Sequence, residues 1–397
     1  MTDLEQLARD PDPTDPEVVR DPYSLYALLR DRCPVAHSSR FGGFWALTRF
    51  DDIHDVSQRP NLFSSAQGVT VPDFGNPLPA IPLEVDPPDH TAYRHLVQAW
   101  FSPGEMRKLQ GDIRRIARDL IEPMRDRPTA DLASGVALPL PPVVIARMMG
   151  LAEEDWPRFR AMAETMLAAA AAEDNETNAE QAFELFSYMW TQIEHRRARP
   201  GDDLLSKIVR LEVDGRPLSD EETLGISFLL VVAGHETTVG GIGFLLKHLA
   251  EYPDVQARVR ADRSLAPSLI EESLRFEPPI QAFARTVTES TCLRGVDLEP
   301  GEKVLLLYGA ANRDPAVFPE PDRFIADRPN NRHLAFGAGP HRCVGAHLAR
   351  VEMQAVLDQV LDRLPPFTLD GDPEVYGGIT RSLHRLPVRF HQPGPGC

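Results

Sequence analysis

The stretch Phe336-Gly-Ala-Gly-Pro-His-Arg-Cys-Val-Gly345 carries most of what this sequence says about fold and chemistry. Three glycines and one proline crowd a single cysteine, and a pattern typical of an amphipathic helix follows from Ala346. Glycine allows backbone conformations that are closed to other residues. A helix that begins just after Cys343 directs its dipole and free N–H groups toward the sulfur, which favours a thiolate over a thiol. We therefore expect Cys343 to be a functional cysteine.

Two other interpretations of this loop stay open on the residues alone. A lone cysteine in a glycine-rich turn is often structural. A zinc site would use His333, His341, Cys343 and His347, but their spacing fits no standard zinc pattern. The other cysteines, at positions 33, 292 and 397, form no Cys-x-x-Cys pair, so neither a disulfide framework nor a classical zinc site is indicated.

Composition and charge exclude several classes of protein. The net charge is -17, from 42 basic and 59 acidic residues, which argues against nucleic acid because a DNA-binding face needs clustered cations. The first 20 residues are polar, with no basic start and no apolar core of a secretory signal. The most apolar run, Ile226–Gly234, is about half the ~20 residues that cross a bilayer. We expect a cytoplasmic protein without membrane association.

Apolar spacing of three and four residues predicts a mainly α-helical fold with small β-sheets. We expect a single domain over residues 1–397, with a flexible segment at residues 1–20. The longest helix is predicted to begin at Ser219, which forms a capping box with Glu222. It continues past Gly240 to Leu249.

The segment Ala233-Gly-His-Glu-Thr-Thr238 interrupts the apolar character of this helix. Glycine inside a helix costs about 1 kcal/mol relative to alanine, and threonine competes for backbone carbonyls and bends helices. We expect a functional distortion beside Glu236 and Thr237. The alternative is that the glycine serves close helix packing.

The cysteine loop matches the signature Phe-Gly-x-Gly-x-His-x-Cys-x-Gly of the cytochrome P-450 family at every defined position. The sequence resembles the soluble bacterial members, which are haem-thiolate monooxygenases, along nearly its whole length. The resemblance implies the cytochrome P-450 fold, with a long central helix over haem b. It makes Cys343 the axial iron ligand and His341 a contact of a haem propionate, with Phe336 and Gly337 in the cofactor-binding loop. A thiolate ligand donates electron density that favours cleavage of dioxygen.

Other motifs gain meaning only from this resemblance. Glu272-Ser-Leu-Arg275 by itself suggests an exposed ion pair, but it lies where the family has its Glu-x-x-Arg motif. The resemblance implies a buried, structural charge network of Glu272, Arg275 and Arg323. It also implies three further propionate partners, which are His90, Arg94 and Arg285.

The same resemblance assigns catalysis. Glu236 and Thr237 match the family's acid and alcohol, which deliver protons during oxygen activation. Their presence argues against a peroxide-driven enzyme. A haem-binding sensor or carrier without turnover is the alternative from another functional class.

The resemblance also places a pocket near the haem, formed by Val232, Ala233, Ile280, Ala282, Phe283 and Ile379. These side chains are apolar, so we expect hydroxylation of a small hydrophobic molecule such as a terpenoid, steroid-like or aromatic compound. Besides O2, the reaction needs electrons, and the family suggests a separate ferredoxin with its NAD(P)H-dependent reductase. A basic docking face would comprise Arg342 with Arg107, Lys108, Arg114 or Arg115.

Overall fold

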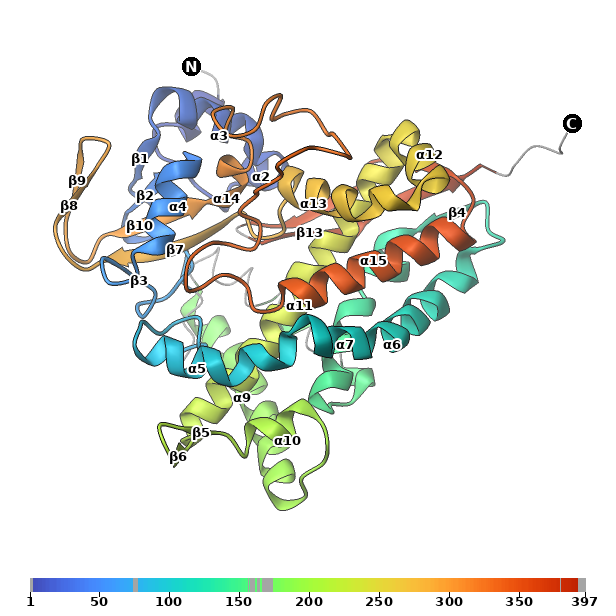
Figure 1. The fold of residues 1–397 in the computed structure, drawn as a ribbon. Helices are drawn as coiled ribbons and strands as arrows, with labels where there is room; N and C mark the ends of the chain where they lie inside the picture. The colour runs from blue at the N-terminus through green and yellow to red at the C-terminus, as the bar shows by residue number, and fades with distance from the viewer. Residues whose placement is uncertain are drawn as a thin grey trace, which may run out of the picture.

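The computed structural model describes residues 3–73, 78–155, 174–378 and 380–391, together with Pro157, Ala161, Met162 and Thr165. The predicted class, mainly α with small sheets, is confirmed (Figure 1). The α-helices are α1 (Asp3–Leu7), α2 (Pro16–Arg20), α3 (Pro22–Arg32), α4 (Phe50–Gln58), α5 (Asp89–Gln98), α6 (Pro103–Ile121), α7 (Leu140–Met149), α9 (Asn175–Ala198), α10 (Leu204–Ile208), α11 (Asp220–Glu251), α12 (Pro253–Ala261), α13 (Ala266–Phe276), α14 (Tyr308–Ala311) and α15 (Ala346–Arg363).

The strands are short, and those of the largest sheet lie together at the left of Figure 1, while β5 and β6 lie at the bottom and β4 at the right. They are β1 (Val35–Ser38), β2 (Phe44–Leu47), β3 (Phe63–Ser64), β4 (Thr129–Asp131), β5 (Glu212–Val213), β6 (Arg216–Pro217), β7 (Ala282–Val287), β8 (Thr291–Leu293), β9 (Val296–Leu298), β10 (Lys303–Leu307), β11 (Phe367–Leu369), β12 (Glu374–Gly377), β13 (Arg381–Arg385) and β14 (Pro387–Phe390).

Helix α11 runs through the middle of the molecule, in contact with α7, α9, α13, α15 and β13. The predicted capping box is confirmed: the Ser219 hydroxyl accepts from the Glu222 N–H, and the Glu222 carboxylate accepts from the Ser219 N–H. The helix is long and apolar enough to cross a membrane, but 67% of its most apolar window is buried inside the fold. We therefore interpret α11 as a core helix.

Helix α11 is continuous from Asp220 to Glu251, without a break at the segment where we expected a distortion. Gly234 instead permits close packing, since a Cβ there would lie 3.1 Å from the Ile145 side chain of α7. The Thr237 hydroxyl donates to the Ala233 carbonyl at 3.0 Å, which satisfies it within the helix. The contacts of Gly234 therefore support the alternative interpretation, in which this glycine serves close helix packing.

The main sheet has the order β1-β2-β10-β7-β3. Strand β10 pairs parallel to β2 and antiparallel to β7. Because side chains alternate along a strand, β7 turns Phe283 and Arg285 to one face and Ala282 and Ala284 to the other. The second face packs on a cluster that includes Tyr26.

Within residues 1–20, where we expected a flexible segment, Asp3–Leu7 and Pro16–Arg20 form the short helices α1 and α2. Val18 of α2 is buried against Leu25 and Leu29 of α3. Apolar burial of this kind stabilises a terminal segment that is otherwise polar.

Candidate functional site

The cysteine loop is closed by a hydrogen bond from the Cys343 N–H to the Phe336 carbonyl, at 2.8 Å. Gly337 and Gly339 have φ angles of 66° and 67°, which favour glycine. A Cβ on Gly339 would lie 2.0 Å from the Ser57 carbonyl of α4, so a side chain there would displace the backbone. Two of the three glycines of the signature, Gly337 and Gly339, are therefore required by the path of the loop.

The Cys343 side chain is accessible to solvent, but protein surrounds it closely enough that the thiol is poorly hydrated. Burial raises the pKa of the Cys343 thiol, while the Gly345 N–H and the nearby Arg94 and Arg350 guanidinium groups lower it. The Gly345 N–H acts in the expected direction and favours the thiolate, but burial outweighs it and the net pKa of the thiol is raised. A metal cation at the sulfur reverses this balance, since a coordinating thiol is deprotonated.

A cluster of cationic side chains lies beside the cysteine loop and joins β7, α5 and the loop. His90 is 3% exposed, and neither of its ring nitrogens has a hydrogen-bond partner among the described residues. Its ring lies 4.2 Å from the ring of His341. Arg285 is 4% exposed and donates to the carbonyl of Ala284.

Burial disfavours the charged forms of these side chains, and the arginines add to this effect at the two histidines. Burial, together with the smaller effects of Arg285, His90 and Arg94, lowers the pKa of His341 to about 3. Burial likewise lowers the pKa of Arg94 and of Arg285. The partly buried carboxylate of Asp86 lies near enough to act on His90 and Arg285, and it accepts from Ser64 and Ser65. The four basic side chains outnumber it, so the cluster forms a site for anions. The two propionates of a haem beside Cys343 fit this donor set.

A zinc site is not supported by the geometry. No group of three or more His, Cys, Asp or Glu side chains in the described ranges is arranged to hold a metal ion. His333, one of the four residues considered for zinc, contacts the Glu271 carboxylate at 3.1 Å instead.

The buried charge network contains a different arginine from the one predicted. Glu272 and Arg275, both 0% exposed, form a bidentate pair at 2.7 and 2.8 Å. Arg323 was the wrong third member, because its side chain is 70% exposed and pairs with Glu320. Only its carbonyl oxygen takes part, as an acceptor from Arg275 and Arg328. The third member of the network is Arg328, which is buried against Glu272. Arg323 and Arg328 lie in an irregular segment. The sequence there has no periodicity from which to predict which of the two arginines points inward.

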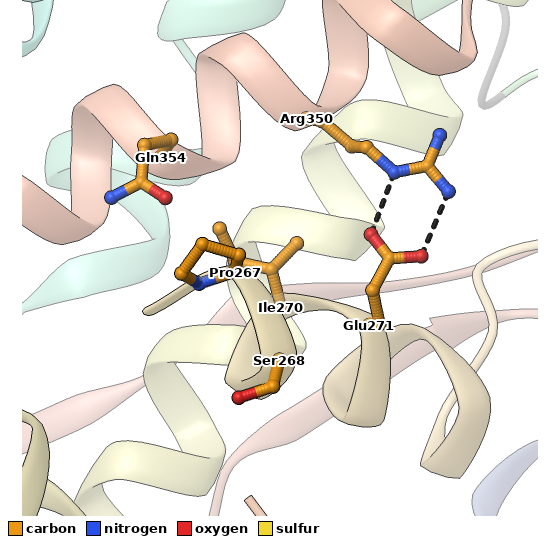
Figure 2. A pocket seen from close by; sticks show the side chains of 6 residues that line it. All are labelled: Pro267, Ser268, Ile270, Glu271, Arg350 and Gln354. Carbon is orange, nitrogen blue, oxygen red and sulfur yellow. Dashed lines mark hydrogen bonds and ion pairs between the residues drawn. The ribbon is translucent and has the colours of Figure 1, made fainter. Parts of the chain in front are cut away.

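A second ion pair, which the sequence analysis missed, supports the loop from its other side. Figure 2 shows the Glu271 carboxylate of α13 bonded to both ends of the Arg350 guanidinium of α15, at 2.6 and 2.8 Å. The guanidinium carbon lies 4.4 Å from the centre of the Phe336 ring. The pair borders a shallow pocket lined also by Pro267, Ser268, Ile270 and Gln354. The only sequence signal for this arrangement was the presence of Phe336 before Cys343 and of Arg350 after it.

The predicted pocket residues divide into two groups. Val232 and Ala233 are exposed in the middle of α11, although many residues around them on this helix are buried, and Ile280 and Phe283 are partly exposed. Ala282 was wrong: it is 1% exposed and packs in the core cluster on the other face of β7. Strand alternation explains this, since Ala282 is next to Phe283. Ile379 lies outside the described residues.

Glu236 and Thr237 lie side by side on α11 with different partners. Thr237 donates to Ala233, as described above, and the Glu236 carboxylate accepts from the Ser382 hydroxyl of β13 at 2.7 Å. Both side chains are partly exposed. An acid and an alcohol at adjacent positions can exchange protons with a bound molecule.

The proposed basic face keeps two unpaired cations. Arg342 is exposed, and neither it nor Arg107 has an acidic partner within the part of the chain that the structure describes. The other three cations each have an acidic partner: Lys108 pairs with Glu105, Arg114 with Asp358, and Arg115 with Asp112.

Comparisons with known proteins agree with this geometry. The sequence model of the family described as Cytochrome P-450 matches residues 129–375. Cytochrome P-450 109 of Bacillus spizizenii is 34% identical over 380 residues, which cover 93% of this chain and 92% of that protein.

Two solved structures are similar over nearly their whole length. The structure of CYP108D1 from Novosphingobium aromaticivorans has a TM-score of 0.87 at 32% identity and covers 98% of both chains. That of CYP109E1 from Bacillus megaterium in complex with testosterone has a TM-score of 0.86 at 31% identity, and covers 94% of this chain and 98% of that one.

Proposed function

Since this chain belongs to the cytochrome P-450 family, a family of haem-thiolate monooxygenases, we propose that it hydroxylates a small hydrophobic molecule at a haem held by Cys343. The enzyme class and the haem cofactor follow from family membership. The substrate, the redox partners, the cytoplasmic location and the role of each residue are the proposal.

The cationic cluster beside the cysteine loop carries this proposal. His90, Arg94, Arg285 and His341 would bind the two propionates, and His90 would thereby gain the partners that it lacks among the described residues. Cys343, with the Gly345 N–H at its sulfur, would be the axial ligand. When bound, the haem supplies the oxygen chemistry, and the thiolate makes it electron-rich.

The chain's own residues would then control protons and substrate. The Thr237 hydroxyl would hold water and the reacting oxygen in place, and Glu236 would relay protons from solvent. Val232, Ala233, Ile280 and Phe283 would form the wall that orients the substrate and excludes water.

The four residues of this wall are all apolar, which favours a terpenoid, steroid-like or aromatic substrate. The complex of the similar CYP109E1 with testosterone supports a steroid-like compound among these. Electrons would come from a ferredoxin and its NAD(P)H-dependent reductase, with docking at Arg342 and Arg107.

The experiment is to screen a library of terpenoids, steroids and aromatic compounds for shifts of the haem Soret band. Compounds that bind are then incubated with NADPH, surrogate redox partners and isotopically labelled dioxygen. A product that carries one labelled oxygen atom supports the proposal. Binding without any oxygenated product indicates a sensor or carrier.

A further inference from the structure

A fully buried serine contacts the proposed proton relay from outside α11. Ser382 of β13 is 0% exposed, and its hydroxyl donates to Oε1 of Glu236 at 2.7 Å. A serine hydroxyl has one hydrogen to donate, and here that hydrogen goes to the acid. Hydrogen bonds to ionised groups are stronger than neutral ones and fix their geometry.

The strand that carries Ser382 is pressed against α11 on the same helix face. Glu236, Gly240 and Gly243 share this face, because they are spaced by four and three residues. A Cβ on Gly240 would lie 2.4 Å from the Arg381 carbonyl, and one on Gly243 would lie 3.4 Å from the Leu383 side chain. Glycine at position 240 therefore lets the backbones of β13 and α11 approach, which brings the Ser382 hydroxyl within reach of Glu236.

Arg381 holds the strand from its other side. Its side chain is 2% exposed and donates to the carbonyls of Val19 and Arg20 at the end of α2, at 3.1 Å each. Its N–H donates to the Pro279 carbonyl at 2.7 Å. Strand β13 is thus fixed between α2 and α11, and Ser382 is on a rigid support.

We propose that Ser382 is a positioning residue for the monooxygenase reaction: it sets the orientation of the Glu236 carboxylate relative to Thr237. This rests on the relay proposed above for Glu236. Adjacent helix residues point about 100° apart, so a partner that fixes Glu236 decides how near its carboxylate lies to the Thr237 hydroxyl. Without this hydrogen bond, we expect the Glu236 carboxylate to be less firmly oriented toward Thr237, so that proton delivery fails in part of the cycles.

The test compares Ser382→Ala with Glu236→Gln and with the double variant in the haem-loaded enzyme. Product, hydrogen peroxide and NADPH are measured together, with the solvent isotope effect and substrate affinity from the Soret shift. Ser382→Ala should slow product formation about tenfold, the size expected for a lost hydrogen bond to a charged group. Peroxide should take a larger share of the electrons, with substrate affinity unchanged. Adding Ser382→Ala to Glu236→Gln should have little further effect, because one relay is affected.

Two variants separate positioning from packing. Ser382→Thr keeps the hydroxyl and should restore coupling. Ser227→Ala removes another fully buried hydroxyl of α11, which donates to the Thr223 carbonyl, and should leave coupling unchanged. If Glu236→Gln uncouples the enzyme but Ser382→Ala does not, the role of Ser382 is overturned alone. If Glu236→Gln couples normally, the proposed relay is overturned, and the role of Ser382 with it.

Discussion

Arg328 donates its Nε hydrogen to both carboxylate oxygens of Glu272, at 3.1 and 3.0 Å, from a position 56 residues further along the chain. Its other nitrogens donate to the carbonyls of Pro319, Glu320 and Arg323. One buried guanidinium therefore ties α13 to the irregular segment that leads into the cysteine loop. Glu272 also holds Arg275, so the carboxylate sits between two cations.

The first prediction tests this network through stability. Arg328→Ala should lower the free energy of unfolding by about 3 kcal/mol, because it removes one of the two buried cations at Glu272 and the donor to the carbonyls of Pro319 and Glu320. Arg323→Ala should lower it by less than about 1 kcal/mol, since that side chain forms an exposed pair. Denaturant unfolding, followed by the loss of the thiolate Soret band, measures both. Equal effects of the two substitutions would contradict the assignment of Arg328.

The second prediction concerns the iron ligand. Cys343→Ala should abolish the long-wavelength Soret band of the reduced carbon monoxide complex, because that band requires a thiolate ligand. Cys33→Ala and Cys292→Ala are matched controls and should retain it, since both cysteines lie on other elements of the fold. Loss of the band in either control would show that the ligand has been misassigned.

The third prediction concerns proton delivery. Thr237→Ala should still bind substrate and consume NADPH, but it should release hydrogen peroxide in place of most product, because the proton relay is lost. A loss of product formation on the order of 10²-fold is the lower end of what general acid–base groups contribute. Thr223→Ala is the control, since this buried α11 threonine also donates to a carbonyl four residues earlier. Full coupling in Thr237→Ala would place the proton path elsewhere.

The fourth prediction concerns electron delivery. Arg342→Glu should slow reduction by an acidic ferredoxin, and the effect should be larger at low salt, because screening increases with ionic strength. Arg210→Glu is a matched reversal of an exposed arginine near β5, away from the cysteine loop. Stopped-flow reduction at several salt concentrations measures both. If the reduction rate is the same in Arg342→Glu and the unmodified protein at every salt concentration, this residue is not part of the docking face.

The fifth prediction concerns acid stability. The Arg216 guanidinium is the main cause that lowers the pKa of Glu222 to about 2, with Tyr93 and the Ser219 N–H adding to it. A lowered pKa stabilises the fold above the ordinary pKa of a glutamate, and this contribution is lost as the pH falls toward 2. Glu222→Gln keeps the capping hydrogen bond but loses the charge.

At pH 7 this variant should be less stable than the unmodified protein by about 1 kcal/mol, because Arg216 is largely exposed and solvent screens the pair. The difference should begin to shrink below about pH 5. Denaturant unfolding at pH 7, 5 and 4 measures it, with the exposed Glu289→Gln as control. A difference that is independent of pH would mean that Glu222 acts through capping alone.

The local parts of this protein could be predicted from sequence wherever neighbouring residues decide the outcome. The capping box at Ser219 and the glycines at positions 337 and 339 are examples, since each depends on contacts or backbone angles within a short segment. The close contact of Gly234 with α7 could not be predicted in this way, because α7 is far away in the sequence. Ala282 failed because the pairing of β7 decides which face of the strand meets the core.

The sequence by itself determined the chemistry, because the residue types around Cys343 and the order of the signature are fixed in one continuous loop. Only the tertiary structure decided which distant side chains complete the site. It chose Arg328 over Arg323, brought Arg350 to Glu271, and placed Ser382 against Glu236. The physical reason is that an ion pair or a hydrogen bond depends on where two segments meet in space, and no periodicity along the chain records that meeting.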